Sequence, residues 1–130
     1  MKKQGILNAA LAETIAGLGH TDWLVVADAG LPIPPGVPVI DLAVRCGVPS
    51  FADVLAAVAA ELQVEHIVIA AEAQQTSDPL PEIAEHFPGV PLTACPHDEF
   101  KQRTARARAV VRTGECTPYH NVLLQAGVIF

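Results

Sequence analysis

The hydrophobic residues of this chain follow two alternating patterns along its length. Between Asn8 and Gly19 they recur at helical spacing, and these two residue types are typical of the start and the end of a helix. Trp23–Ala27 is instead a continuous apolar run, which is typical of a strand covered on both faces. The chain is therefore expected to alternate helices with buried strands.

The same two patterns recur through the rest of the sequence. They predict helices at residues 9–18, 50–62, 78–87 and 97–108. They predict strands at residues 23–27, 38–42, 64–70, 90–94, 109–112 and 121–124. Ser50 and Ser77 are interpreted as helix caps. Residues 30–38 hold four prolines and two glycines, so an irregular but ordered loop is expected there.

Strands that alternate with helices indicate an α/β fold, here a three-layer α/β/α sandwich with a largely parallel sheet. A length of 130 residues is typical of one domain, so residues 1–130 are expected to form a single domain. The 51% share of hydrophobic residues excludes a disordered chain, and no apolar run is long enough to span a membrane. Residues 1–5 hold two lysines with no apolar segment behind them. A signal peptide is therefore not expected, and the cytoplasm is the expected location.

The charge of the chain bears on its partners. Eight basic residues against fourteen acidic residues give a net charge of −6, which disfavours binding to nucleic acid but suits a neutral small molecule. Only 17% of the residues are charged, although a domain of this size has a large surface relative to its volume. We therefore expect part of that surface to be buried against further copies of the chain.

Three residues near strand ends are candidates for chemistry. Asp28 ends a predicted strand, where ligands of parallel sheets usually bind. It accepts sugar hydroxyl groups, orients an imidazole, or caps the following loop. His97 follows another predicted strand. It is either a second polar group of the site or an incidental residue in the first turn of a helix. His20 lies at a helix end, where it acts as a general acid or base or caps helix carbonyls.

The densest group of polar residues is the segment 114–121. It includes Asn121 and Tyr119, the one tyrosine in the sequence, and both side chains suit hydrogen bonding to a polyol. Its glycine, proline and asparagine equally suit an ordinary turn. The segment precedes a predicted strand, so in a parallel sheet it lies at the opposite edge from Asp28. A pocket lined by both would then lie between two subunits, unless the last strand is antiparallel.

Several kinds of site lack a supporting motif. The chain has neither of the glycine-rich phosphate-binding motifs nor the nucleophile elbow of serine hydrolases. His20, His97 and His120 do not have the spacing of a known metal site, so no metal is expected. The three cysteines include no Cys-x-x-Cys pair, so neither a disulfide framework nor a cysteine-based zinc site is expected. Nothing near Cys116 in sequence would activate it as a nucleophile.

Six blocks of the sequence closely resemble, in the same order, those of the D-ribose pyranase family. They are GHTD at 19–22, DAGLPIP at 28–34, GVPSF at 47–51, HDEFK at 97–101, GECTPY at 114–119 and AGV at 126–128. The resemblance covers essentially the whole chain. The related L-fucose mutarotase family shares the Gly-His and Gly-Glu blocks but differs elsewhere, so ribose is the better-supported sugar.

The resemblance implies an activity and a set of site residues. The activity is interconversion of the pyranose and furanose forms of D-ribose, without a metal or an organic cofactor. The catalytic histidine of the family matches His20, and its substrate-binding positions match Asp28, His97, Tyr119, His120 and Asn121. The family has a small residue at the position of His120. A main-chain contact there would tolerate the change, whereas a side chain in the pocket would alter the sugar preference.

The family also implies a ring-shaped homo-oligomer, a decamer, with pockets at subunit contacts. In the implied reaction a base takes the proton of the anomeric hydroxyl group, an acid protonates the ring oxygen, and the open-chain aldehyde closes through another hydroxyl. We expect His20 to be the proton donor, and water or another pocket group to be the base. Three alternatives stay open: a non-catalytic sugar-binding accessory protein of pentose uptake, a purely structural oligomer, and an L-fucose mutarotase.

Overall fold

The computed structural model describes residues 1–76 and 78–130. Ser77, interpreted from the sequence as a helix cap, lies outside the described residues. The helices are α1 (Ala9–Gly17), α2 (Phe51–Ala59), α3 (Ala73–Thr76), α4 (Leu80–His86) and α5 (His97–Thr104). The strands are β1 (Trp23–Ala27), β2 (Val39–Asp41), β3 (Val64–Ala70), β4 (Leu92–Cys95), β5 (Ala109–Arg112) and β6 (Val122–Ala126).

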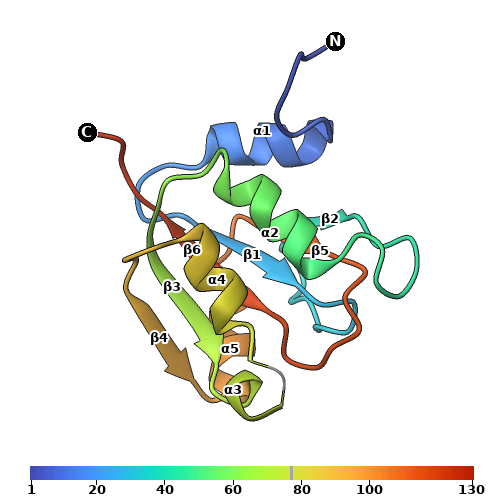
Figure 1. Cartoon of the computed structure of the whole chain (residues 1–130), viewed down its shortest axis with the longest axis vertical. Coiled ribbons are helices and arrows are strands. Elements are labelled where there is room, and N and C mark those ends of the chain that lie inside the picture. The colour runs from blue at the N-terminus through green and yellow to red at the C-terminus, as the bar shows by residue number, and fades with distance from the viewer. Residues whose placement is uncertain (77) are drawn as a thin grey trace.

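The strands of the described residues form one six-stranded sheet in the order β2-β5-β1-β6-β3-β4 (Figure 1). β6 lies between β1 and β3 and runs antiparallel to both. The remaining neighbours pair in parallel: β5 with β1 and β2, and β4 with β3. The prediction of a largely parallel sheet is confirmed, and β6 runs against the direction of its neighbours.

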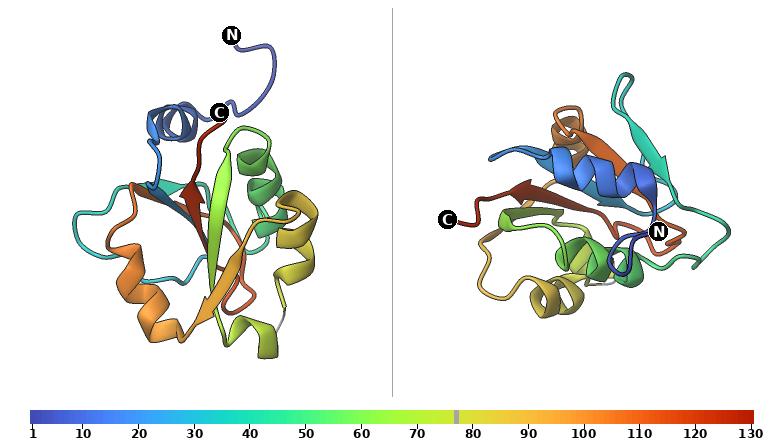
Figure 2. Two further views of the ribbon diagram at one scale, coloured as in Figure 1. Left: turned by 90° about the vertical axis from the view of Figure 1, so that its left-hand side faces the viewer. Right: turned by 90° about the horizontal axis from the view of Figure 1, so that it is seen from above.

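Helices cover both faces of the sheet, which gives the three layers predicted from the sequence (Figure 2). Alternate residues of β1 point to opposite faces. Leu24 and Val26 join one core cluster, and Val25 and Ala27 join the other. The first cluster also contains residues of α1, α2 and α4, and the second contains residues of α5 and of the proline-rich loop that follows β1. Because both its faces are buried, β1 needs a continuous apolar run.

The caps predicted for the first two helices are present. Asn8 caps α1, where its side chain accepts the backbone N–H of Leu11 at 3.0 Å. Ser50 caps α2 in the same way, accepting the backbone N–H of Asp53 at 3.1 Å. Both helices end slightly before the predicted residue, since Leu18 after α1 is extended and Ala60 after α2 begins a turn.

The later helices are shorter than the sequence pattern predicts. α5 ends at Thr104 rather than at residue 108, because the backbone N–H of Arg108 donates to the carbonyl of Trp23 (2.8 Å) and so brings the chain alongside β1. The four-residue α3 is not predicted, since it is too short to show helical periodicity. None of the helices in the part of the chain that the structure describes has the length and apolar composition needed to cross a membrane.

Phe100 anchors α5 to the sheet, because its side chain is fully buried in the second core cluster. We expect Phe100→Ala to lower the free energy of unfolding by about 3–5 kcal/mol, through lost contacts and the cavity left behind. Gln102→Ala, an exposed change on the same helix, should alter it by less than about 0.5 kcal/mol. Urea unfolding followed by circular dichroism measures both values. Equal unfolding midpoints for the two variants would contradict this role of Phe100.

Candidate functional site

A cavity of about 460 Å³ opens at the edge of the sheet where β1 ends. Its wall contains Asp28, which follows β1, and His97, the first residue of α5. It also contains Tyr119 and Asn121, from the segment that leads into β6. The structure thus gathers, around one cavity, most of the residues that the sequence singled out.

The direction of β6 explains this gathering. A strand that runs antiparallel to β1 starts at the edge where β1 ends, so Asn121 lies beside Asp28 in the same chain. The expectation that segment 114–121 lies at the opposite edge from Asp28 is therefore wrong, because it assumed a parallel last strand. The position of segment 114–121 therefore no longer argues for a pocket between two subunits.

Asp28 and Asn121 are joined by two hydrogen bonds. The backbone N–H of Asp28 donates to Oδ1 of Asn121, and Nδ2 of Asn121 donates to Oδ2 of Asp28, each at 2.8 Å. Oδ1 of Asp28 accepts the backbone N–H of Gly30 at 2.9 Å. Asp28 therefore caps the loop after β1, and it also presents a fixed, largely buried carboxylate to the cavity.

His97 is held through its backbone and leaves one ring nitrogen unsatisfied. Its N–H donates to both carboxylate oxygens of Glu72, at 3.1 and 2.9 Å, and this hydrogen bond lowers the pKa of Glu72. The His97 ring stacks on Phe100 and meets Tyr119 edge-on, with centroids 6.3 and 5.0 Å apart. Its buried Nδ1 has no hydrogen-bond partner within the described residues, so it is available to a ligand.

Tyr119 has a left-handed backbone, with a φ of 65°. For a residue with a side chain this conformation costs about 1–3 kcal/mol, and such residues cluster at functional sites. The carbonyl of Tyr119 accepts the backbone N–H of Asn121 at 2.8 Å, which makes a tight turn before β6. The turn places the phenol ring against His97 in the wall of the cavity.

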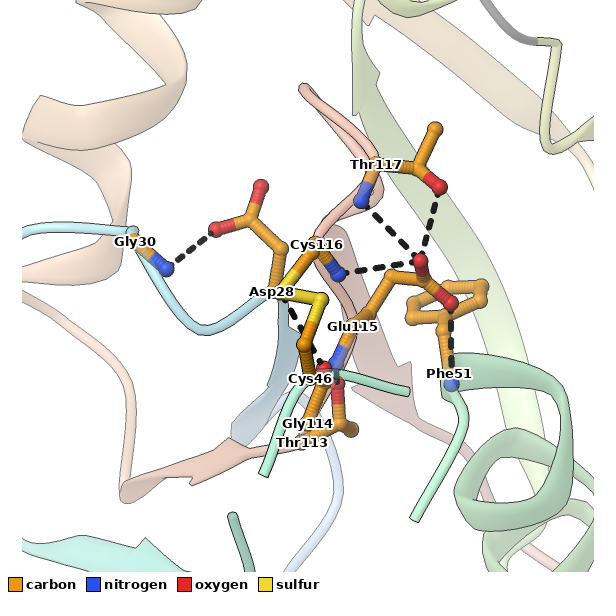
Figure 3. Close-up of a disulfide and its surroundings, with 9 residues drawn as sticks. All are labelled: Asp28, Gly30, Cys46, Phe51, Thr113, Gly114, Glu115, Cys116 and Thr117. Carbon is orange, nitrogen blue, oxygen red and sulfur yellow. Dashed lines mark hydrogen bonds between the residues drawn. A yellow bond between two sulfur atoms is a disulfide. The ribbon is translucent and has the colours of Figure 1, made fainter. Parts of the chain in front are cut away.

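The carboxylate of Glu115 organises the segment that leads into β6 (Figure 3). Its Oε1 accepts the backbone N–H groups of Cys116 and Thr117, both at 3.0 Å, and the Thr117 hydroxyl at 2.7 Å. Its Oε2 accepts the N–H of Phe51 at the start of α2, at 3.4 Å. Burial opposes ionisation, but the hydrogen bonds from Thr117 and Phe51, together with nearby His120, outweigh it and lower the pKa of Glu115.

A second connection joins the same segment to the loop between β2 and α2. Cys46 and Cys116 form a disulfide across a sequence separation of 70 residues (Figure 3). This pairing corrects the expectation drawn from the cysteine count, since spacing alone cannot show that two distant residues meet. Gly114 lies beside it, and a Cβ there would collide with the backbone oxygens of Arg45 and Val48. The loop and the segment therefore pack backbone to backbone.

His20 does not line this cavity. It precedes β1 and so lies at the opposite edge of the sheet, and β1 alone spans about 17 Å between the two edges. Its Nε2 lies 2.9 Å from Oε2 of Glu65 in β3. This contact with a carboxylate differs from the capping of helix carbonyls, which was the alternative interpretation of His20.

His120 also lies outside the wall of the cavity. Its buried ring meets Phe51 of α2 edge-on, with centroids 5.5 Å apart. Tyr119 and Asn121, on either side of it in sequence, line the cavity instead. The side chain of His120 is thus directed toward α2 and the core.

Two residues that shape the site are absent from the sequence-based candidates. Glu72 follows β3 and Glu115 follows β5, each just beyond the carboxyl end of a strand. The same position drew attention to Asp28. Applying that rule to every acidic residue near a strand end would have found both.

The cavity offers the carboxylates of Asp28 and Glu115, an amide, an imidazole nitrogen and a phenol. Within residues 1–76 and 78–130, no three His, Cys, Asp or Glu side chains gather closely enough to hold a metal ion. Uncharged donors and acceptors beside two carboxylates are suited to binding several hydroxyl groups of a small polar molecule.

The sequence matches the model of one family and several named proteins. Residues 1–129 match the RbsD / FucU transport protein family. The chain is 54% identical to the D-ribose pyranase of Laribacter hongkongensis and 56% identical to that of Paracidovorax citrulli, over 100% of both chains in each case.

Solved structures share the fold. Bacillus subtilis RbsD complexed with D-ribose is 48% identical, with a TM-score of 0.96 over 100% of both chains. The fucose mutarotase of Streptococcus pneumoniae, complexed with L-fucose, is 22% identical, with a TM-score of 0.80 over 95% of each chain. At that identity the second likeness concerns the fold alone.

Folding lowers the pKa of Glu115, so its ionised form stabilises the folded state. This stabilisation is fully present above the usual glutamate value of 4.5 and is lost as the pH falls through the lower pKa of the folded state. Glu115→Gln removes it. The difference in unfolding free energy between the wild-type protein and this variant should therefore shrink between about pH 7 and about pH 3. Urea unfolding at a series of pH values measures the difference, and a constant value would contradict the prediction.

Proposed function

The chain belongs to the RbsD / FucU transport protein family, and from this premise we propose that it is a D-ribose pyranase. Such an enzyme is an isomerase that interconverts the pyranose and furanose forms of D-ribose. The likeness to a ribose-bound structure, at 48% identity over both full chains, carries the proposal. The relatives named D-ribose pyranase, at 54% and 56% identity, support it. The proposal includes a cytoplasmic location, which suits an enzyme of sugar metabolism.

The cavity suits a pentose. Asp28 and Asn121 are already fixed by their mutual hydrogen bonds, so binding of sugar hydroxyls to them would lose little conformational entropy. The buried Nδ1 of His97 would gain a hydrogen bond that the described residues do not supply. The Tyr119 hydroxyl group adds a donor and an acceptor. We assign the binding of ribose hydroxyl groups to these four side chains.

Ring opening needs proton transfers and no lasting bond to the protein. A base takes the proton of the anomeric hydroxyl group, the bond between C1 and the ring oxygen breaks, and that oxygen accepts a proton. The open-chain aldehyde then closes through a different hydroxyl group. A positioned acid or base contributes about 10²–10⁴-fold to such a reaction. We assign the proton donor to His20, and the base to water or to a second group of the pocket.

The positions of these groups imply a site shared between subunits. His20 and the cavity lie at opposite edges of the sheet, too far apart to act on one ribose within a single chain. The His20 that serves each cavity would therefore come from another copy. Exposed apolar residues, among them Leu7, Val44 and Ile129, support burial against such copies. The assembly we propose is the ring-shaped decamer implied by the family.

His120 would contact the sugar through its backbone. Its side chain packs on Phe51, whereas the neighbouring Tyr119 and Asn121 line the cavity. A larger side chain at this position is then compatible with the ribose preference that the family implies.

His20→Ala should remove most of the catalysis and leave ribose binding largely intact, because the residue lies outside the cavity that holds the sugar. NMR exchange spectroscopy on D-ribose at equilibrium measures exchange between pyranose and furanose signals, and calorimetric titration measures binding. We expect a loss of about 100-fold or more in the exchange rate. Loss of binding instead would contradict the role of His20 as a proton donor.

The same measurement on the wild-type protein tests the function itself. Spectra that are equal with and without protein, combined with saturable ribose binding, would replace the enzyme by a sugar-binding accessory protein. The absence of both would indicate a structural oligomer. Faster exchange of L-fucose than of D-ribose would identify a fucose mutarotase.

Mixed assemblies test the shared site. His20→Ala and His97→Ala subunits should each be inactive alone, because each lacks one half of every site. When the two are unfolded together and refolded, about one quarter of the sites in a randomly mixed assembly would combine an intact cavity with an intact His20. Recovery of activity toward that level is expected. Mixed assemblies that stay inactive would show that both residues must belong to one chain.

A further inference from the structure

His20 contacts an acidic side chain at the edge of the sheet where β1 begins. Its Nε2 lies 2.9 Å from Oε2 of Glu65. His20 comes from the loop before β1 and Glu65 from the start of β3, 45 residues further along the chain. Neither residue lines the cavity described above.

An irregularity in β3 directs Glu65 toward this contact. The register between β3 and β6 shifts between Val64 and His66, so Glu65 is an extra residue in the ladder. Val64 accordingly joins the same core cluster as Ile67, although regular alternation would put these two residues on opposite faces. Bulges of this kind re-aim a side chain and are frequent beside active sites.

The backbone around the pair is specialised as well. A Cβ on Gly127 would lie 3.0 Å from Cβ of Glu65, so a larger residue there would displace the glutamate. Thr21, the residue after His20, has a left-handed backbone with a φ of 69°. Its N–H donates to the carbonyl of Ala126 at 2.9 Å, which ties the loop that carries His20 to the end of β6.

Stability does not account for these features. The side chains of His20 and Glu65 are 53% and 36% exposed, and exposed ion pairs add little to stability. Asp22, the acidic residue in the loop that carries His20, contacts other groups: its Oδ2 accepts the N–H of Gly19 at 2.9 Å and lies 3.6 Å from Nε of Arg108. A bulge, a close-packed glycine and a left-handed residue thus converge on one exposed histidine, which indicates a role in function.

We propose that Glu65 is the positioning residue of His20: by accepting a hydrogen bond from Nε2–H, it sets the tautomer and the orientation of the ring. The inference rests on the proposed function, in which His20 is the proton donor. With Nε2 held by Glu65, Nδ1 is the ring nitrogen free to face the ribose bound by a neighbouring copy.

The proton balance of the reaction agrees with this assignment. The protonated ring carries a proton on each nitrogen, and Nδ1 gives its proton to the ring oxygen as the bond from C1 breaks and leaves its electron pair on that oxygen. Water takes the anomeric proton, and the aldehyde forms. The neutral ring that remains has its proton on Nε2, the tautomer that Glu65 stabilises. On closure a different hydroxyl group attacks C1 and returns a proton to Nδ1, while the aldehyde oxygen regains one from water.

The kinetic test compares Glu65→Ala and Glu65→Gln with the wild-type protein, by exchange spectroscopy over a range of ribose concentrations. Glutamine keeps an acceptor oxygen of the same reach, whereas alanine removes it. We expect kcat to fall about tenfold or more in Glu65→Ala and less in Glu65→Gln, with KM within about twofold of the wild-type value. Glu13→Gln removes the same charge from an exposed position on α1 and should change neither constant.

The spectroscopic test follows the tautomer itself. Long-range proton–nitrogen NMR of labelled histidines shows which nitrogen is protonated, and the His20 signals are those missing from His20→Ala. We expect the neutral ring to carry its proton on Nε2 in the wild-type protein and to become a mixture of tautomers in Glu65→Ala. An unchanged tautomer in Glu65→Ala would overturn the inference, whether or not kcat falls, since a loss of rate alone would reflect a structural role. Full activity in His20→Ala would instead overturn the proposed role of His20, and the tautomer would still decide whether Glu65 positions the ring.

Discussion

The direction of β6 is the constraint on which the site depends. Because β6 runs antiparallel to β1 and β3, the segment before it reaches the edge where β1 ends, and the segment after it reaches the edge where β1 begins. The first segment brings Asn121 to Asp28. The second brings Gly127 against Glu65, the residue that contacts His20. One strand therefore supports both halves of the proposed active site, and it also keeps them apart. If His20 is the proton donor, as we propose, a second copy of the chain has to bring it to the cavity.

Carboxylates stabilise the loops around the cavity by accepting hydrogen bonds from backbone N–H groups. Asp28 and Glu72 accept backbone N–H groups of residues that follow strands, and Glu115 gathers several such groups at one turn. Each of these bonds joins an ionised acceptor to an amide, which makes it stronger than a bond between neutral groups. The excess of acidic residues, which disfavours nucleic acid as a partner, thus also stabilises loops inside the protein. It fixes the loops that carry Tyr119 and His97, so the cavity keeps its shape before any ligand arrives.

Residue type and position in the sequence were enough to nominate most of the site. Asp28 and His97 follow strands, and Tyr119 and Asn121 belong to the densest polar segment, so local patterns marked all four. The same patterns placed that segment at the wrong edge of the sheet, because periodicity reveals that a strand exists and says nothing of its direction. Glu72 and Glu115, which hold the loops of the site, were not among the candidates. In sequence, an acidic residue that binds a backbone amide cannot be told from a solvated one.

What the sequence determined by itself is therefore local: the apolar runs of β1 and β3, the caps Asn8 and Ser50, and the layered α/β class that alternating elements require. These follow from interactions between residues a few positions apart, which periodicity and capping rules describe. The tertiary structure alone decided the direction of β6, the pairing of Cys46 with Cys116, and the separation of His20 from the cavity. Each of these depends on which distant segments pack together, and that choice is made by the free energy of the whole core rather than by any one stretch of the chain.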